Sequence, residues 1–220
     1  MTSVKTVAQN CLDKTPTLSI REDILGVYGA DNPQSRSLKE RLDLIQNKPF
    51  VKVALVTIQG AVPTPQIDLD TANEIYQREC DAWIYPVDSV TVTRNDLLVL
   101  DQDDCNGPNS HSVSDEEDEL FDIGRNLGAS IVCYYIQSST VGGFGCAAHP
   151  PGRRGFWVGN NATTRTWGHE LSHIVGDNDH VSNTDNLMFG GGTNNITNLP
   201  ADLTNSQCDD ILDDPDMESC

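Results

Sequence analysis

The residues best suited to chemistry are two histidines and a glutamate in the run His169-Glu170-Leu171-Ser172-His173. In this H-E-x-x-H pattern the imidazoles stand at positions i and i+4, on one face of a helix, so both can bind a single metal ion. Glu170 is rotated by about 100° around the helix and can meet a water molecule at that ion. The pattern predicts a metal site with an adjacent carboxylate; the alternative is a helix with two surface histidines.

The residues that follow extend this pattern. Gly176 comes three residues after the second histidine, where a glycine can end the helix in a left-handed turn. Asp179 and His180 follow, and Leu187-Met188 comes after them. The segment resembles the extended zinc signature of the metzincin metallopeptidases, H-E-x-x-H-x-x-G-x-x-H/D, and Leu187-Met188 resembles the methionine turn of that family.

Two neighbouring residues compete for the place of the third metal ligand. The usual spacing selects Asp179, and an aspartate there followed by Leu-Met and a glycine run resembles the snapalysin branch of the family. Counting back from Met188 instead selects His180, as if one residue were inserted after Gly176. Successive side chains of an extended segment point apart, so we expect only one of the two to bind. Imidazole is the commoner zinc ligand and favours His180, leaving Asp179 as the alternative.

The resemblance implies a zinc-dependent endopeptidase that hydrolyses the peptide bonds of proteins with a metal-activated water. His169, His173 and His180 would bind one Zn²⁺, and Glu170 would act as the general base. Met188 would form the floor beneath the site without binding the ion. By the same resemblance, the protein or peptide substrate would lie extended along an edge strand.

That edge strand would include Gly142, Gly145 and Ala147, and the substrate would pair with it through main-chain hydrogen bonds.

Two other interpretations compete with that of a zinc endopeptidase. A thermolysin-like site needs a downstream glutamate as third ligand, and the one glutamate after the motif, Glu218, lies next to the C-terminal end. A catalytically inactive acidic binding protein could retain a zinc metallopeptidase fold, but the presence of Glu170 argues against it.

Hydrophobic and turn patterns predict the elements that position these residues. A buried strand at 50–58 precedes a helix that Asp68 or Asp70 would cap and that carries Ala72, Tyr76, Cys80 and Trp83 at helical spacing. Further strands are expected at 87–94 with a continuation at 97–100, at 129–137, and at the sheet edge at 142–148 and 155–159. Further helices are expected at 37–46, from Ser114 to a stop at Gly128, from Thr163 or Thr164, and from Thr204, two of them with capping boxes.

This order resembles the metzincin α+β fold, a twisted mixed sheet with backing helices, an active-site helix, a Met-turn and a C-terminal helix. Residues 50–220 would form the catalytic domain. Residues 1–49 would be an N-terminal extension, with a short pro-segment as one interpretation. The aspartates between 209 and 216 are expected to form a solvated tail.

Composition limits the function further. The chain has 33 Asp and Glu against 14 Lys and Arg, a formal charge of −19, which argues against nucleic-acid binding. No apolar run reaches the roughly 18–20 residues of a membrane span. Seven cysteines without a C-x-x-C pair favour disulfides and hence a secreted protein, although residues 1–10 show no apolar leader. We expect a monomer. The acidic segment 101–109 leaves a structural Ca²⁺ open as a second ion.

Overall fold

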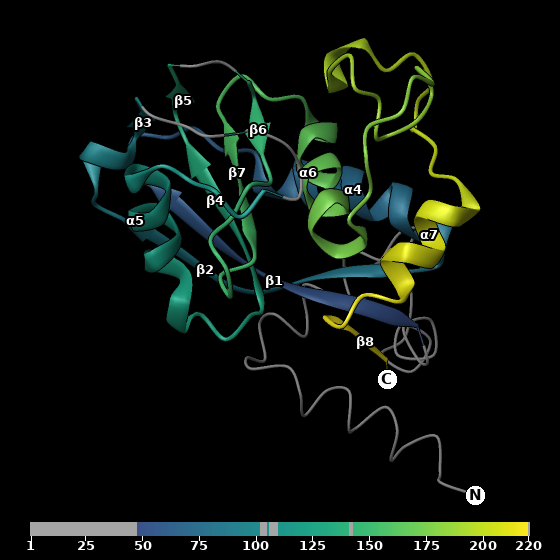
Figure 1. Cartoon of the computed structure of the whole chain (residues 1–220), viewed down its shortest axis with the longest axis horizontal. Coiled ribbons are helices and arrows are strands. Elements are labelled where there is room, and N and C mark those ends of the chain that lie inside the picture. The colour runs from purple at the N-terminus through teal and green to yellow at the C-terminus, as the bar shows by residue number, and fades with distance from the viewer. Residues whose placement is uncertain (1–47, 102–104, 106–109, 141–142, 220) are drawn as a thin grey trace, which may run out of the picture.

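The computed structural model describes residues 48–101, 105, 110–140 and 143–219 (Figure 1). The expected helix at 37–46, nearly all of the extension 1–49, most of the acidic segment 101–109, and Gly142 lie outside the described residues. The described elements, in chain order, are β1 Pro49–Ile58, α4 Pro65–Cys80, β2 Trp83–Val92, β3 Val99–Leu100, α5 Asp115–Ile123, β4 Ile131–Ile136, β5 Ser138–Ser139, β6 Gly145–Cys146, β7 Gly155–Gly159, α6 Thr164–Gly176, α7 Asn205–Leu212 and β8 Met217–Ser219.

A mostly parallel sheet forms the centre of the protein. Its strands follow the order β2-β1-β4-β7-β6; the first four run parallel, and β6 runs antiparallel to β7 with Gly145 opposite Val158. β8 adds an antiparallel partner at the start of β1, and β3 pairs with β5 in a separate small sheet. β6 is therefore the last strand on its side of the described sheet.

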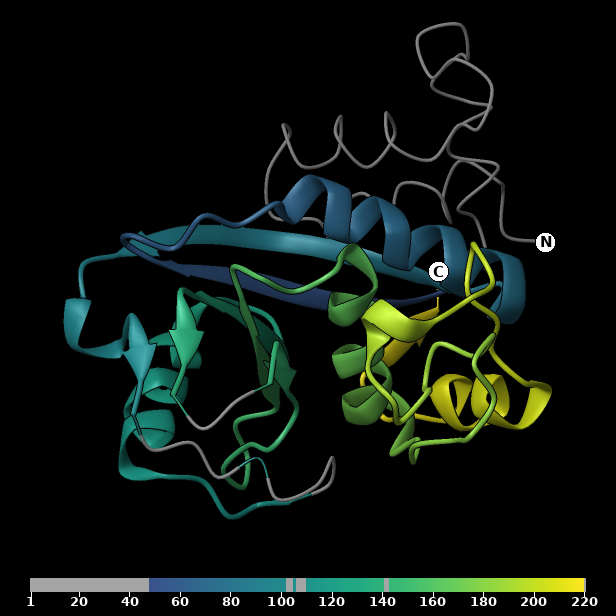
Figure 2. The same ribbon diagram turned by 90° about the horizontal axis from the view of Figure 1, so that it is seen from above.

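Alternating side chains of the central strands build a core on each face of the sheet. In β1, Val51, Val53 and Leu55 point to one face, while Ala54 and Val56 point to the other. The first set packs with residues of α4, α6 and α7, and the second packs with residues of α5 (Figures 1 and 2). Because strand residues alternate with a period of two, a strand that faces helices on both sides needs apolar residues at successive positions, as β1 has from Val53 to Val56. This architecture confirms the predicted twisted mixed sheet with backing helices.

The structure corrects the expected start of α4 and the strand after it. The helix begins at Pro65 with Thr64 as its N-cap, because proline fits the first helical position. Asp68 is therefore a buried residue of the first turn and not a cap. Trp83 does not continue the helix but opens β2, and the expected continuation at 97–100 divides into the 3₁₀ turn Asn95–Leu97 and the short β3.

Other local predictions agree more closely. Ser114 and Glu117 form the expected capping box of α5, and the 3₁₀ turn Gly124–Asn126 carries the chain on to Gly128, which has a φ of +70°. Thr204 begins α7 with a second capping box. β7 is an inner strand and not an edge strand, because β6 covers its other side.

The acidic C-terminal segment is not the solvated tail expected from its charge. The guanidinium of Arg154 forms ion pairs with Asp214 and Asp216 and donates to the carbonyl of Ile174 in α6. After these aspartates the chain forms β8, in which Glu218 pairs with Lys52 of β1. The segment is ordered because a half-buried arginine needs carboxylates as partners, and Arg154 lies 60 residues earlier in the chain.

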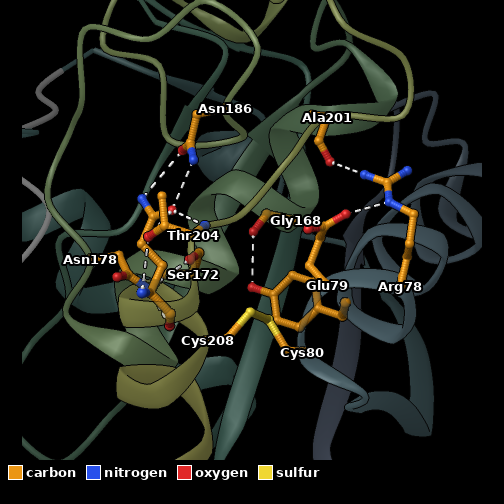
Figure 3. The surroundings of a disulfide bond; sticks show 12 residues. Arg78, Glu79, Cys80, Gly168, Ser172, Asn178, Asn186, Ala201, Thr204 and Cys208 are labelled. Atoms are coloured by element: carbon orange, nitrogen blue, oxygen red, sulfur yellow. Dashed lines mark hydrogen bonds and ion pairs between the residues drawn. A yellow bond between two sulfur atoms is a disulfide. The ribbon is translucent and has the colours of Figure 1, made fainter.

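Within the described residues, two disulfides tie distant segments together. Cys80 at the end of α4 is bonded to Cys208 in α7 (Figure 3). Cys105 is bonded to Cys146 in β6. Cys133 in β4 is a buried free thiol.

No helix within the described ranges is long and apolar enough to cross a bilayer.

Candidate metal centre

The helix α6 carries the H-E-x-x-H residues. Its N-cap is Thr163, which forms a capping box with Thr166. The left-handed residue at the other end is Asp177, with a φ of 46°, and not Gly176, which is the last helical residue. Gly176 serves close packing instead: a Cβ there would overlap the side-chain nitrogen of Asn178 and lie 3.0 Å from Cγ1 of Ile211 in α7.

Three histidines converge at one point. The Nε2 atom of His169 lies 3.2 Å from Nε2 of His173 and 3.1 Å from Nε2 of His180, and the last two are 3.2 Å apart. His180 comes from the segment after α6 and is exposed, whereas the other two are buried. Asp179 is exposed and is not a member of this group.

The rings of the two helical histidines are held from behind by backbone carbonyls. Nδ1 of His169 lies 2.7 Å from the carbonyl oxygen of Leu187, and Nδ1 of His173 lies 2.5 Å from that of Asn178. A carbonyl can only accept, so each Nδ1 must carry the proton and each Nε2 must present a lone pair. Two acceptors therefore face each other across the centre.

The donor set fits a zinc ion. Around a tetrahedral Zn²⁺ with Zn–N distances of about 2.0–2.1 Å, ligand nitrogens lie about 3.3–3.4 Å apart, close to the 3.1–3.2 Å measured here. Three neutral imidazoles are a common zinc ligand set that leaves a fourth position open. Within the described part of the chain, no other group of three or more His, Cys, Asp or Glu residues converges in this way, and nothing supports a Ca²⁺ site.

Burial keeps the two helical histidines ready to bind a cation. Loss of hydration lowers the pKa of His169 to about 4, against the opposing effect of its hydrogen bond to Leu187. Burial and the neighbouring histidines lower the pKa of His173 to about 3. Both rings are therefore neutral at pH 7, as a metal ligand must be.

Glu170 lies between α6 and β6. It is 7% exposed, and its burial raises the pKa of its carboxyl to about 8. A Cβ added to Gly145 in β6 would lie 2.7 Å from Oε1 of Glu170, so strand and carboxyl are in direct contact. The helix that carries His169 and His173 thus also places the Glu170 carboxyl against the last strand of the described sheet.

The expected Met-turn and edge-strand residues lie close to these groups. Met188 is fully buried and directly follows Leu187, whose carbonyl holds His169. Its carbonyl accepts from the backbone N–H of Val181, next to His180, which ties the two segments together. Gly145 is in β6, and Ala147 is buried directly after it.

Sequence reasoning did not find the supporting role of Asn178, and it placed Leu187 only in the expected Met-turn. Asn178 and Leu187 act through backbone carbonyls, which every residue type has, so no side-chain pattern marks them. The contact between Gly145 and Glu170 depends on how β6 lies against α6. The alternative ligand Glu218 is in β8, paired with Lys52 and outside the histidine group.

Comparisons with known proteins support the fold. No protein-family profile and no curated protein sequence matches this chain. Among solved structures, metalloproteinase-II from Bacteroides fragilis is similar with a TM-score of 0.56 and 12% identity, over 96% of this chain and 70% of that one. A structure of a chaperone–substrate complex is similar with a TM-score of 0.51 and 12% identity, over 76% of this chain but 34% of that one. The chain therefore has a metallopeptidase-like fold.

Proposed function

We propose that this protein is a zinc endopeptidase of the metzincin type, with residues 50–220 as its catalytic domain. One observation carries the proposal: three imidazole Nε2 atoms lie within 3.2 Å of one another, two of them from the helix that also carries the buried Glu170, in a metallopeptidase-like fold. His169, His173 and His180 would hold the ion, and Asp179 would remain outside the ligand set. The two disulfides suit secretion into an oxidising compartment.

The residues around the ion divide the chemical work. Bound Zn²⁺ supplies a Lewis acid that acidifies water and polarises a carbonyl group. Glu170 accepts a proton from the attacking water and returns it to the leaving amine nitrogen. Burial raises the pKa of Glu170 to about 8, which favours the acid form that returns the proton; the carboxylate form that accepts it would need the nearby cation to lower that pKa.

The substrate would be an extended stretch of protein or peptide paired with β6. This strand is last in the described sheet order and touches Glu170 through Gly145, so a peptide alongside it would pass the carboxyl. Main-chain pairing at a sheet edge selects extended peptides of many sequences. Met188 would support the ligands from below.

Glutamate replacement is the sharpest test of this function. Full-length protein and a form lacking residues 1–49 would each be loaded with Zn²⁺ and assayed on casein. We expect Glu170→Ala to bind zinc like the wild type but to cleave at least about 100-fold more slowly, since general acid–base groups contribute about 10²–10⁴-fold. We also expect 1,10-phenanthroline to stop wild-type cleavage.

The outcomes separate the enzyme from a binding protein. Cleavage at the wild-type rate by Glu170→Ala, or cleavage that ignores the chelator, would refute the proposed mechanism. Zinc binding by both wild-type forms without cleavage of casein or of a random peptide library would instead identify an inactive binding protein with this fold.

A further inference from the structure

Gln207 lies in the first turn of α7, where the C-terminal helix meets both segments that hold the helical histidines. We propose that Gln207 is a positioning residue for the metal centre, acting through Asn178 and Asn186 on the carbonyls that orient His173 and His169. The inference rests on the proposed zinc site and adds a residue that touches neither the ion nor the substrate. Three contacts carry it.

The first contact is a reciprocal pair of amides. The side-chain Nδ2 of Asn186 lies 2.9 Å from Oε1 of Gln207, and Nε2 of Gln207 lies 3.2 Å from Oδ1 of Asn186. Asn186 Oδ1 also accepts from the backbone N–H of Met188 at 2.8 Å. The peptide unit between Leu187 and Met188 is therefore held at its carbonyl by His169 and at its N–H by Asn186.

The second contact reaches the other histidine. The side-chain nitrogen of Asn178 lies 3.4 Å from the backbone carbonyl of Gln207 and 3.0 Å from the hydroxyl of Ser172 (Figure 3). The carbonyl of Asn178 accepts from Nδ1 of His173. Asn178, Asn186 and Gln207 are each at most 7% exposed, so water cannot readily replace these bonds.

The third contact fixes α7 itself. Cys208, next to Gln207, is bonded to Cys80 in α4 (Figure 3). Ile211 packs against Gly176 at the end of α6. The amide network therefore joins the two histidine-holding carbonyls to a helix that is covalently anchored.

A purely structural role is the competing explanation, because Gln207 also belongs to the capping box of α7. Its Oε1 accepts from the backbone N–H of Thr204 at 2.8 Å, and its own N–H donates to the Thr204 hydroxyl at 3.2 Å. Gln207→Glu keeps the acceptor for the cap but loses the donor to Asn186. Thr204→Ala weakens the cap while leaving the Asn186 contacts in place, so it is the matched control.

The test measures metal binding by full-length protein. Zn²⁺ affinity would be determined by competition with a chromophoric chelator, the visible absorption of the Co²⁺-loaded forms would be recorded, and thermal unfolding would be followed without metal. We expect Gln207→Glu and Gln207→Leu to weaken Zn²⁺ binding by about 10- to 100-fold and to alter the Co²⁺ spectrum. We expect Thr204→Ala to stay within about threefold of the wild type, with an unchanged spectrum.

Either of two results would overturn the inference while leaving the proposed function intact: Gln207→Glu binding Zn²⁺ as tightly as the wild type, or Thr204→Ala losing as much affinity as Gln207→Glu. If Gln207→Leu does not fold, Gln207→Glu decides alone. A wild-type chain that binds no Zn²⁺ would refute the proposed function and this inference together.

Discussion

Replacing Gly145 with alanine tests whether contact with β6 sets the position of Glu170. The added Cβ would lie 2.7 Å from Oε1 and 2.8 Å from Cγ of Glu170, and 2.7 Å from Cγ2 of Thr166. Carbon atoms pack at about 3.5–4.0 Å, so the Glu170 side chain or the strand must move by about 0.7 Å or more. Pairing with β7 and the Cys105–Cys146 disulfide restrain β6, so we expect the glutamate to move.

The expected result is a loss of activity without a loss of metal. A displacement of this size in a reacting group predicts a kcat lower by about 10- to 100-fold, and overpacking predicts a loss of about 1–3 kcal/mol in unfolding free energy. Peptide hydrolysis, zinc content and urea unfolding would be measured. Gly159→Ala in β7 is the control, since its added Cβ would meet no atom closer than 3.6 Å. Wild-type kcat and stability in Gly145→Ala would show that the contact does not position Glu170.

Two further predictions address the third ligand and a buried acid. His180→Ala is expected to weaken Zn²⁺ binding by at least about 100-fold and Asp179→Ala by less than about threefold; metal analysis showing the reverse would assign the aspartate as ligand. Burial raises the pKa of Asp68 from 3.8 to about 6. The preference of the folded state for protonated Asp68 therefore contributes fully to stability below pH 3.8, and this contribution is lost as pH rises through about 6. Relative to the wild type, Asp68→Asn should therefore gain up to about 3 kcal/mol in unfolding free energy between pH 4 and pH 7, and a pH-independent difference in urea unfolding would contradict this.

The parts of the site that the sequence could predict are those set by local geometry. Histidines at positions i and i+4 share a helix face wherever the helix lies, so His169 and His173 could be paired from spacing alone. The capping boxes of α5 and α7 are equally local, since cap and partner are three residues apart. The apolar run of β1 likewise indicates a buried strand, and the structure shows it to be buried on both faces.

The parts that the sequence could not decide depend on contacts between distant segments. Asp179 and His180 are adjacent in sequence, and which one faces α6 follows from the path of the chain after Asp177. The backbone bond from the N–H of Val181 to the carbonyl of Met188 helps to set that path, and the two residues are seven positions apart in an irregular segment. The ion pairs of Arg154 with Asp214 and Asp216 join residues still farther apart in the sequence. The charge of this segment alone therefore predicts a solvated tail, because it does not show the arginine that the aspartates bind.

The arrangement of protons at the centre explains why such distant support is needed. His169 and His173 both donate from Nδ1 to carbonyls, so their Nε2 lone pairs face each other across 3.2 Å without a proton between them. That contact is unfavourable until a cation fills it, and the rings would turn apart if the carbonyls were free to move. The fold must therefore hold the carbonyls of Leu187 and Asn178 rigidly in place. Neither lies in a helix or a strand, so side chains such as Asn186 and Gln207 must add to the few backbone bonds of these segments, among them the bond from the N–H of Leu187 to the carbonyl of Asp202.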